Sequence, residues 1–163
     1  IDVFSNRIEI SNPGSSLVEK DMILNDRKSR NEKLANAMRE LNLCEERGSG
    51  LDRTFKAAED WRLPAPDFMM SANTVRVVMF AAKTFKEMSK AEKLRSLYFH
   101  CALRFEVQDY MNNASLRARF GLADDEYQTV TDLITAAKKA NRIKAADTGS
   151  GRKGAKYIPY WAG

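Results

Sequence analysis

The side chains best suited to chemistry in this sequence form a basic cluster near its C-terminal end. Between positions 138 and 156, seven lysines and arginines stand against a single acid, Asp147. The basic residues are Lys138, Lys139, Arg142, Lys144, Arg152, Lys153 and Lys156. Such clusters attract polyanions, because ammonium and guanidinium groups bind phosphate oxygens. The cluster predicts a nucleic-acid partner, and the alternative is that it only keeps a surface soluble.

The charge of the chain is unevenly distributed. The 163 residues include 27 Lys and Arg and 22 Asp and Glu, for a net charge of +5. Residues 1–88 carry 14 basic and 14 acidic side chains, so the whole excess lies in residues 89–163. With 44% hydrophobic residues, the chain is long enough for one domain or two small ones. We therefore expect two domains, 1–88 and 89–163.

A second candidate for anion binding is the glycine-rich segment Arg47-Gly48-Ser49-Gly50, which separates two predicted helices. Backbone N–H groups in such a segment, together with a helix N-terminus, can bind a nucleotide phosphate. The alternative is a simple connector between helices.

The sequence offers few other reactive groups. The single histidine, His100, is surrounded by Leu97 and Cys101, so we expect it in the core. Cys44 is not expected to be a nucleophile, because the neighbouring acids Glu45 and Glu46 disfavour its thiolate. Trp61 and Trp161 are expected to pack inside the fold. We expect no catalytic residue and no metal ligand.

The elements that carry the basic cluster are predicted in the order helix, helix, helix, strand, strand. The helices are 90–104, 116–120 and 123–140, and the short strands 143–146 and 157–160 flank a glycine-rich hairpin. This order is typical of a winged helix-turn-helix, in which the third helix enters the major groove. Its outer face offers Gln128, Thr131, Thr135 and Lys138, and Arg117 and Arg119 precede the turn. Arg152, Lys153 and Lys156 belong to the hairpin.

The same fold can also serve as a protein-interaction or dimerisation module. Three acids, Asp124, Asp125 and Glu126, stand at the start of the third helix and favour that alternative, since they repel phosphate.

The first domain is predicted to mix strands and helices. Residues 1–11 alternate apolar and polar types, with Val3, Ile8 and Ile10 on one face, and residues 74–82 form a buried strand that pairs with them. Helices are expected at 31–43 and 51–61, after a loop at 15–30. The edge of the first strand would invite pairing with a second chain. The fold class is therefore α+β.

Several motifs resemble a known family. They are Arg7-Ile8-Glu9-Ile10-Ser11-Asn12-Pro13-Gly14, Arg30-Asn31, Leu34-Ala35-Asn36-Ala37 and Glu46-Arg47-Gly48-Ser49-Gly50-Leu51-Asp52-Arg53. These residues resemble the C-terminal half of a divergent histidine-kinase-type ATP-binding domain, the ATP-dependent DNA helicase RecG C-terminal family. The segments 113–122 and 156–162 resemble the winged-helix tail of bacterial transcriptional regulators that combine this domain with an N-terminal Schlafen AlbA-type domain.

The resemblance implies a partial ATPase-like α/β sandwich followed by a winged helix-turn-helix. It makes Asn12, Gly14, Gly48, Ser49 and Gly50 a phosphate-side wall for ATP in the longer protein. In this family an Asn-bearing helix that binds magnesium precedes the first strand of this chain, and an adenine-reading Asp stands where this chain has Ser11. We therefore expect no bound cofactor for this fragment.

The sequence predicts a cytoplasmic DNA-binding transcriptional regulator whose winged helix contacts double-stranded DNA, and a homodimer is a further prediction. The longest apolar stretch is too short to span a membrane. The alternatives are a helicase-related ATPase in the longer protein and a winged helix used for protein interaction.

Overall fold

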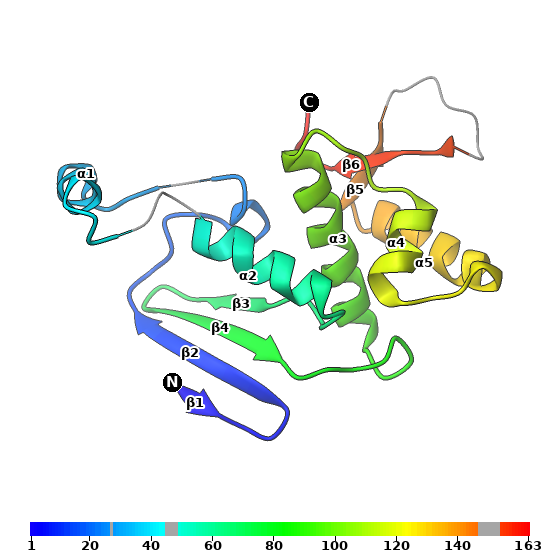
Figure 1. Cartoon of the computed structure of the whole chain (residues 1–163), viewed down its shortest axis with the longest axis horizontal. Helices are drawn as coiled ribbons and strands as arrows, with labels where there is room; N and C mark the ends of the chain where they lie inside the picture. Colours follow the sequence, from blue (N-terminus) through cyan, green and yellow to red (C-terminus); the bar gives the residue numbers. More distant parts are fainter. Residues whose placement is uncertain (27, 45–48, 147–153) are drawn as a thin grey trace.

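The protein has an α+β fold, as the sequence predicts (Figure 1). A computed structural model describes residues 1–26, 28–44, 49–146 and 154–163. Its α-helices are α1 (Glu32–Glu40), α2 (Ser49–Asp60), α3 (Lys90–Glu106), α4 (Asn113–Phe120) and α5 (Tyr127–Lys139), with 3-10 turns η1 (Lys20–Met22) and η2 (Asp124–Glu126). Its strands are β1 (Asp2–Val3), β2 (Arg7–Pro13), β3 (Asp67–Met70), β4 (Thr74–Phe80), β5 (Ile143–Ala145) and β6 (Tyr157–Pro159).

The first sheet is antiparallel and has the strand order β1-β2-β4-β3. In its central register Ile10 lies opposite Val77, which lies opposite Phe68. The predicted pairing of the first strand with 74–82 is confirmed. The prediction of one strand over residues 1–11 is wrong, because the Phe4 N–H donates to Arg7 O at 2.9 Å and turns the chain between β1 and β2.

The apolar row predicted for the first strand is not buried. Val3 is 76% exposed and Ile8 is 37% exposed. The core of this region lies on the same face but toward the β3 edge, where Phe55 of α2 packs against Phe68 of β3 and Phe99 of α3. The helical layer therefore covers the β3 side of the sheet better than the β1 side.

Helix α1 begins as predicted. Asn31 caps it, accepting a hydrogen bond from Leu34 N at 3.0 Å. None of its residues is buried, and in Figure 1 it stands apart from the rest of the molecule.

The second region is built around α3. A capping box of Ser89 and Glu92 starts this helix, and Leu97 and Cys101 on it are fully buried. Helix α4 ends at Gly121, whose φ of +66° lies in the left-handed region that only glycine adopts without strain. Strands β5 and β6 pair in an antiparallel sheet. Met111 forms an isolated antiparallel β-bridge with Tyr157 of β6.

Helix α3 contributes to both cores. Its residues Leu97 and Cys101 belong to the core of the second region, whereas Tyr98, Phe99 and Ala102 belong to the core beneath the sheet. No described helix is long and apolar enough to cross a membrane.

Candidate nucleic-acid interface

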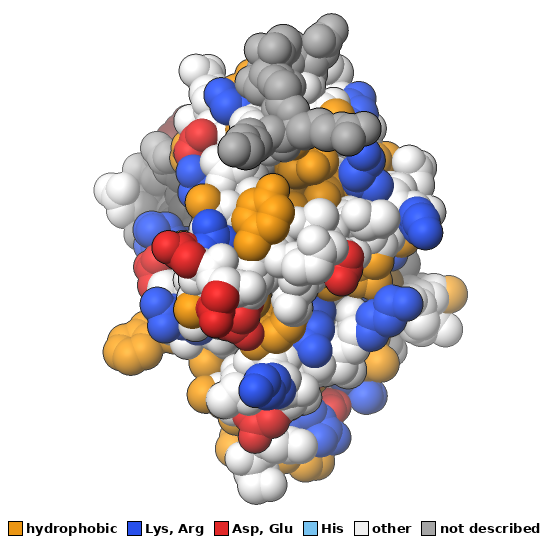
Figure 2. Space-filling model, turned by 90° about the vertical axis from the view of Figure 1, so that its right-hand side faces the viewer, with side chains coloured by type: hydrophobic (Ala, Val, Ile, Leu, Met, Phe, Trp, Pro, Cys, Tyr) orange, Lys and Arg blue, Asp and Glu red, His pale blue; other side chains and the backbone are white. Residues whose placement is uncertain are grey.

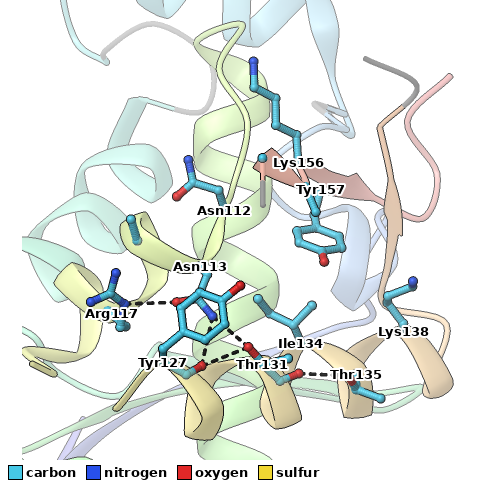
Figure 3. A pocket seen from close by; sticks show the side chains of 13 residues that line it. Asn112, Asn113, Arg117, Tyr127, Thr131, Ile134, Thr135, Lys138, Lys156 and Tyr157 are labelled. Atoms are coloured by element: carbon cyan, nitrogen blue, oxygen red, sulfur yellow. Dashed lines mark hydrogen bonds between the residues drawn. The ribbon is translucent and has the colours of Figure 1, made fainter. Parts of the chain in front are cut away.

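A groove of about 600 Å³ runs along the outer face of α5 (Figure 3). It lies between that helix, the N-terminal end of α4 and the start of β6. Its lining consists of Asn112, Asn113, Ala114, Arg117, Tyr127, Thr131, Ile134, Thr135, Lys138, Gly154, Ala155, Lys156 and Tyr157. We call it the α5 groove.

The α5 side of the groove follows from helical spacing. Tyr127, Thr131, Thr135 and Lys138 are four, four and three residues apart, so they form one stripe, because successive residues turn by about 100°. Ala137 and Leu133 point the other way and are buried in the core. The sequence-predicted base-facing residues Thr131, Thr135 and Lys138 are thus brought together.

The polar groups of this stripe are tied to one another. Asn113 Nδ2 donates to Tyr127 O and to Thr131 Oγ1, both at 3.1 Å. Thr131 Oγ1 donates to Tyr127 O and Thr135 Oγ1 to Thr131 O, both at 2.9 Å. Figure 3 shows this chain of bonds along the helix. The stripe is rigid, and its hydroxyl oxygens keep acceptor capacity toward the groove.

Two cations predicted to bind DNA, Arg117 and Lys156, line the groove, but their charged groups contact other side chains. Arg117 forms an ion pair with Asp124 and donates from Nε to Asn113 Oδ1 at 3.0 Å. The ammonium of Lys156 lies 4.9 Å from the centre of the Tyr110 ring, and in Figure 3 its side chain points away from Tyr157. Lys138 is the exposed cation that α5 itself brings to the groove.

Three further predicted residues are exposed beside the groove. Gln128 donates from Nε2 to Asp132 Oδ1 at 2.8 Å. Lys139 and Lys144 are exposed and form no ion pair with any residue that the structure describes. On this side of the molecule, basic and acidic side chains are interspersed (Figure 2).

The prediction that Arg119 contacts phosphate is wrong. The residue is only 5% exposed. Its Nη2 donates to Leu63 O at 2.6 Å and its Nε to Glu59 Oε1 at 3.2 Å. Burial lowers the pKa of the guanidinium, and Glu59 opposes that shift. Arg119 therefore joins α4 to the end of α2.

Arg142 is also directed toward the first region. It forms an ion pair with Asp21, and its guanidinium lies 6.0 Å from the centre of the Tyr98 ring. This pairing removes it from the stripe of cations expected beside α5.

Histidine 100 is a core residue, as predicted. Its Nδ1 lies 3.0 Å from Glu59 Oε1 and its Nε2 lies 3.1 Å from Ser115 Oγ. Burial raises the pKa of the Cys101 thiol to about 12, so this thiol stays protonated. Trp161 packs edge-on against Phe105, as expected, but Trp61 is exposed and the prediction that it packs is wrong.

The predicted nucleotide-binding residues do not line one common cavity, unlike the residues of the α5 groove. Asn12 is the residue before the last of β2, and Gly14, at φ +99°, donates its N–H to Asn73 O at 2.8 Å. Gly50 lies in the first turn of α2, and an added Cβ there would meet nothing within 4 Å. Ser49 begins α2. Gly48, like Arg152 and Lys153 of the hairpin, lies outside the described residues.

A cavity of about 580 Å³ lies next to these residues, between α1, Leu51 of α2 and the loop of residues 15–30. Arg30 and Arg39 line it together with Lys28, but Asn12, Gly14 and Gly50 do not. The described residues therefore offer cations for phosphate, and Ser11 supplies no carboxylate to read a base. The fit to a complete ATP is partial.

The sequence reasoning missed the aromatic walls of the α5 groove. Tyr127 could have been found, because it lies four residues before Thr131 on the same stripe. Tyr157 could not, since its place depends on the bridge to Met111. Burial raises the pKa of its hydroxyl.

Residues 1–79 match a family model described as "Putative ATP-dependent DNA helicase recG C-terminal". The match runs from β1 into β4. This region is therefore similar to a helicase-related, ATPase-type domain, in agreement with its motifs. No curated protein and no solved structure matches the chain.

Proposed function

We propose that residues 89–163 form a winged helix-turn-helix that binds double-stranded DNA, and that the chain is part of a cytoplasmic transcriptional regulator. The observation that carries this proposal is the α5 groove, in which the third helix of the predicted motif keeps a polar stripe exposed beside the base of the hairpin. The element order of the region, with its paired closing strands, supports it.

The charges define how DNA would be held. Lys138, Lys139 and Lys144 are exposed around α5 and β5, and the sequence adds Arg152 and Lys153 in the hairpin. Phosphate contacts of this kind supply affinity without reading sequence. Thr131 and Thr135 face the groove and supply the contacts to base edges.

Fluorescence anisotropy of a labelled random duplex, recorded across a salt series, tests the proposal. Each phosphate contact contributes about 0.9 to the slope of log K against log salt. The double variant Lys138→Ala, Lys139→Ala should therefore reduce that slope by about 2, and Arg152→Ala with Lys153→Ala should do the same. The matched control, Lys33→Ala with Lys56→Ala, removes two exposed lysines of the first region and should leave the slope unchanged.

Failure of the wild-type chain to bind duplex at low salt would overturn the proposal. The interaction-module alternative would then come first, and a dimer that buries the exposed Tyr127 would support it. Analytical sedimentation tests this alternative: the wild type should be a dimer, and Tyr127→Ala should be a monomer.

The family match favours a second candidate, nucleotide binding by the first region within the longer protein. ATP would lie against the wall formed by Asn12, Gly14 and Gly50, with cations of the neighbouring cavity toward its phosphates. Phosphate release by the longer protein tests this candidate. Since a methyl group at Gly50 meets no tertiary neighbour within 4 Å among the residues that the structure describes, loss of activity in Gly50→Ala would report a ligand there. Equal release by this variant would contradict the wall.

A further inference from the structure

A second surface lies beside the turn between α4 and η2. It is a hollow of about 580 Å³ that we call the Trp61 pocket. Trp61, Arg62 and Lys86 supply its exposed aromatic and basic groups, Lys83 is a half-buried cation of its lining, and Phe85 and Phe120 form an edge-to-face pair there. It shares no lining residue with the α5 groove.

The backbone holds Trp61 outside the fold. Trp61 follows the last residue of α2, and Arg62 adopts a left-handed φ of +53°. The N–H of Arg62 donates to Glu59 O at 2.9 Å and that of Leu63 to Ala58 O at 2.8 Å. These two bonds define a Schellman motif, in which glycine is the usual residue at the left-handed position. The indole stays 77% exposed.

The side chain of Arg62 extends to the turn that follows α4. Its guanidinium lies so close to Gly121 that a Cβ there would be 2.7 Å from Nη1. The left-handed residue therefore places a cation against the turn of the predicted helix-turn-helix. A strained residue with such a placement points to function.

The pocket lining carries three cations, Arg62, Lys83 and Lys86, and two acids, Glu87 and Glu126. Lys83 pairs with Glu92 at 2.6 Å, but Lys86 and Arg62 form no ion pair with any residue that the structure describes. The two acids accept hydrogen bonds from Thr84 and Ala123 and form no ion pair with Arg62 or Lys86. Glu87 accepts from the Thr84 hydroxyl and N–H, both at 2.7 Å, and Glu126 accepts from Ala123 N at 3.1 Å.

We propose that the Trp61 pocket binds single-stranded nucleic acid, with one unpaired base stacked on Trp61 and adjacent phosphates bound by Arg62 and Lys86. An exposed indole between cations is the pairing of groups that such strands need, since every base offers a ring face and every linkage a charge. A duplex hides its ring faces, so it cannot use the indole. A protein partner would have to bring an apolar group and separate acidic side chains to the same place, whereas each nucleotide carries both a ring and a phosphate. The proposal is independent of duplex binding at the α5 groove.

The test is the binding of a labelled 15-nucleotide oligothymidylate to the full chain, followed by anisotropy. Base stacking on an aromatic side chain contributes about 5- to 150-fold in affinity. We expect Trp61→Ala to weaken binding by about 10-fold or more, and Trp61→Phe to keep most of it. Lys86→Ala should lower the salt slope by about 0.7.

Matched controls separate this site from the α5 groove. Val107→Ala truncates another highly exposed apolar residue, and Lys33→Ala removes another exposed lysine, so neither should change binding. Duplex binding should be the same in Trp61→Ala and the wild type. The proposal is overturned if the wild type does not bind the oligothymidylate at low salt. It is equally overturned if Trp61→Ala binds the oligothymidylate like the wild type. Loss of that binding in Lys138→Ala would then place it in the α5 groove.

Discussion

The two regions of this molecule differ in how completely they bury their apolar side chains. Among the described residues, the large hydrophobic side chains that remain exposed lie mostly in the first region, and only Val107 and Tyr127 belong to the second. Those of the first region are Ile1, Val3, Phe4, Ile8, Leu17, Leu34, Met38, Leu41, Leu43, Trp61 and Met69.

The difference follows from the origin of each core. The core of the second region is made entirely from residues between Phe85 and Tyr157. The core beneath the sheet needs Tyr98, Phe99 and Ala102 from α3, which is the central helix of the second region. We therefore expect the second region, extended to include Phe85 and Met88, to fold from its own sequence, whereas the first depends on α3.

The strongest test of this comparison is to separate the regions. We expect residues 84–163 alone to unfold cooperatively in urea, because their core is intact. Residues 1–83 alone should lack cooperative unfolding, because three core side chains are missing. Circular dichroism during a urea titration measures both. A cooperative transition in residues 1–83 would show that the sheet region does not need α3.

The buried ion pair between the regions should give the next largest effect. Arg119→Met removes the partner of Glu59 and leaves a carboxylate beside His100, so we expect a loss of about 3 kcal/mol of stability. Urea denaturation of the full chain measures the loss. The double variant Glu59→Met, Arg119→Met should lose less than the sum of the two single variants, since it leaves no unpaired charge at the junction. Additive losses would contradict the pairing.

A pair of leucine truncations compares the two regions directly. Leu116 in α4 is fully buried, and Leu34 in α1 is 56% exposed. We expect Leu116→Ala to cost about 2–5 kcal/mol and Leu34→Ala to change stability by less than about 0.5 kcal/mol. Thermal denaturation of both variants, with the wild type as reference, decides it. A large loss for Leu34→Ala would contradict the exposed position of α1.

The sequence predicted most of the second region because its signals are local. The capping of α4 by Asn112, the left-handed Gly121 and the apolar spacing of α5 each act within a few residues. The order of elements could be read for the same reason. In the first region, the helices expected at 31–43 and 51–61 also rest on local signals, and the structure has α1 and α2 there.

What the sequence could not provide depends on distant contacts. Arg119 has the same type and spacing as a phosphate-binding arginine, and only its approach to Glu59, sixty positions earlier, shows that it is buried. The exposure of Val3 likewise depends on which edge of the sheet the helices cover, and that of Trp61 on the left-handed Arg62 that follows α2. The base-facing residues were predicted from the helix at 123–140 alone, so Tyr157, which reaches the α5 groove from β6, was missed.

The smallest effect concerns Glu92 at the start of α3, where the helix shared by both cores is anchored. Burial tends to raise the pKa of this carboxyl, but hydrogen bonds from Lys83 and Ser89 outweigh burial and lower the pKa below its ordinary value of 4.5. A carboxyl whose pKa is lower in the folded state stabilises the fold above its unfolded pKa. That contribution should be lost as the pH falls through the folded pKa.

Urea denaturation between pH 3 and pH 7, about the range of carboxyl titration, should show a smaller loss of stability on acidification for Glu92→Gln than for the wild type. Because α3 serves both cores, this loss should appear equally in signals from the two regions. A loss confined to the sheet region would mean that the second region does not depend on the start of α3.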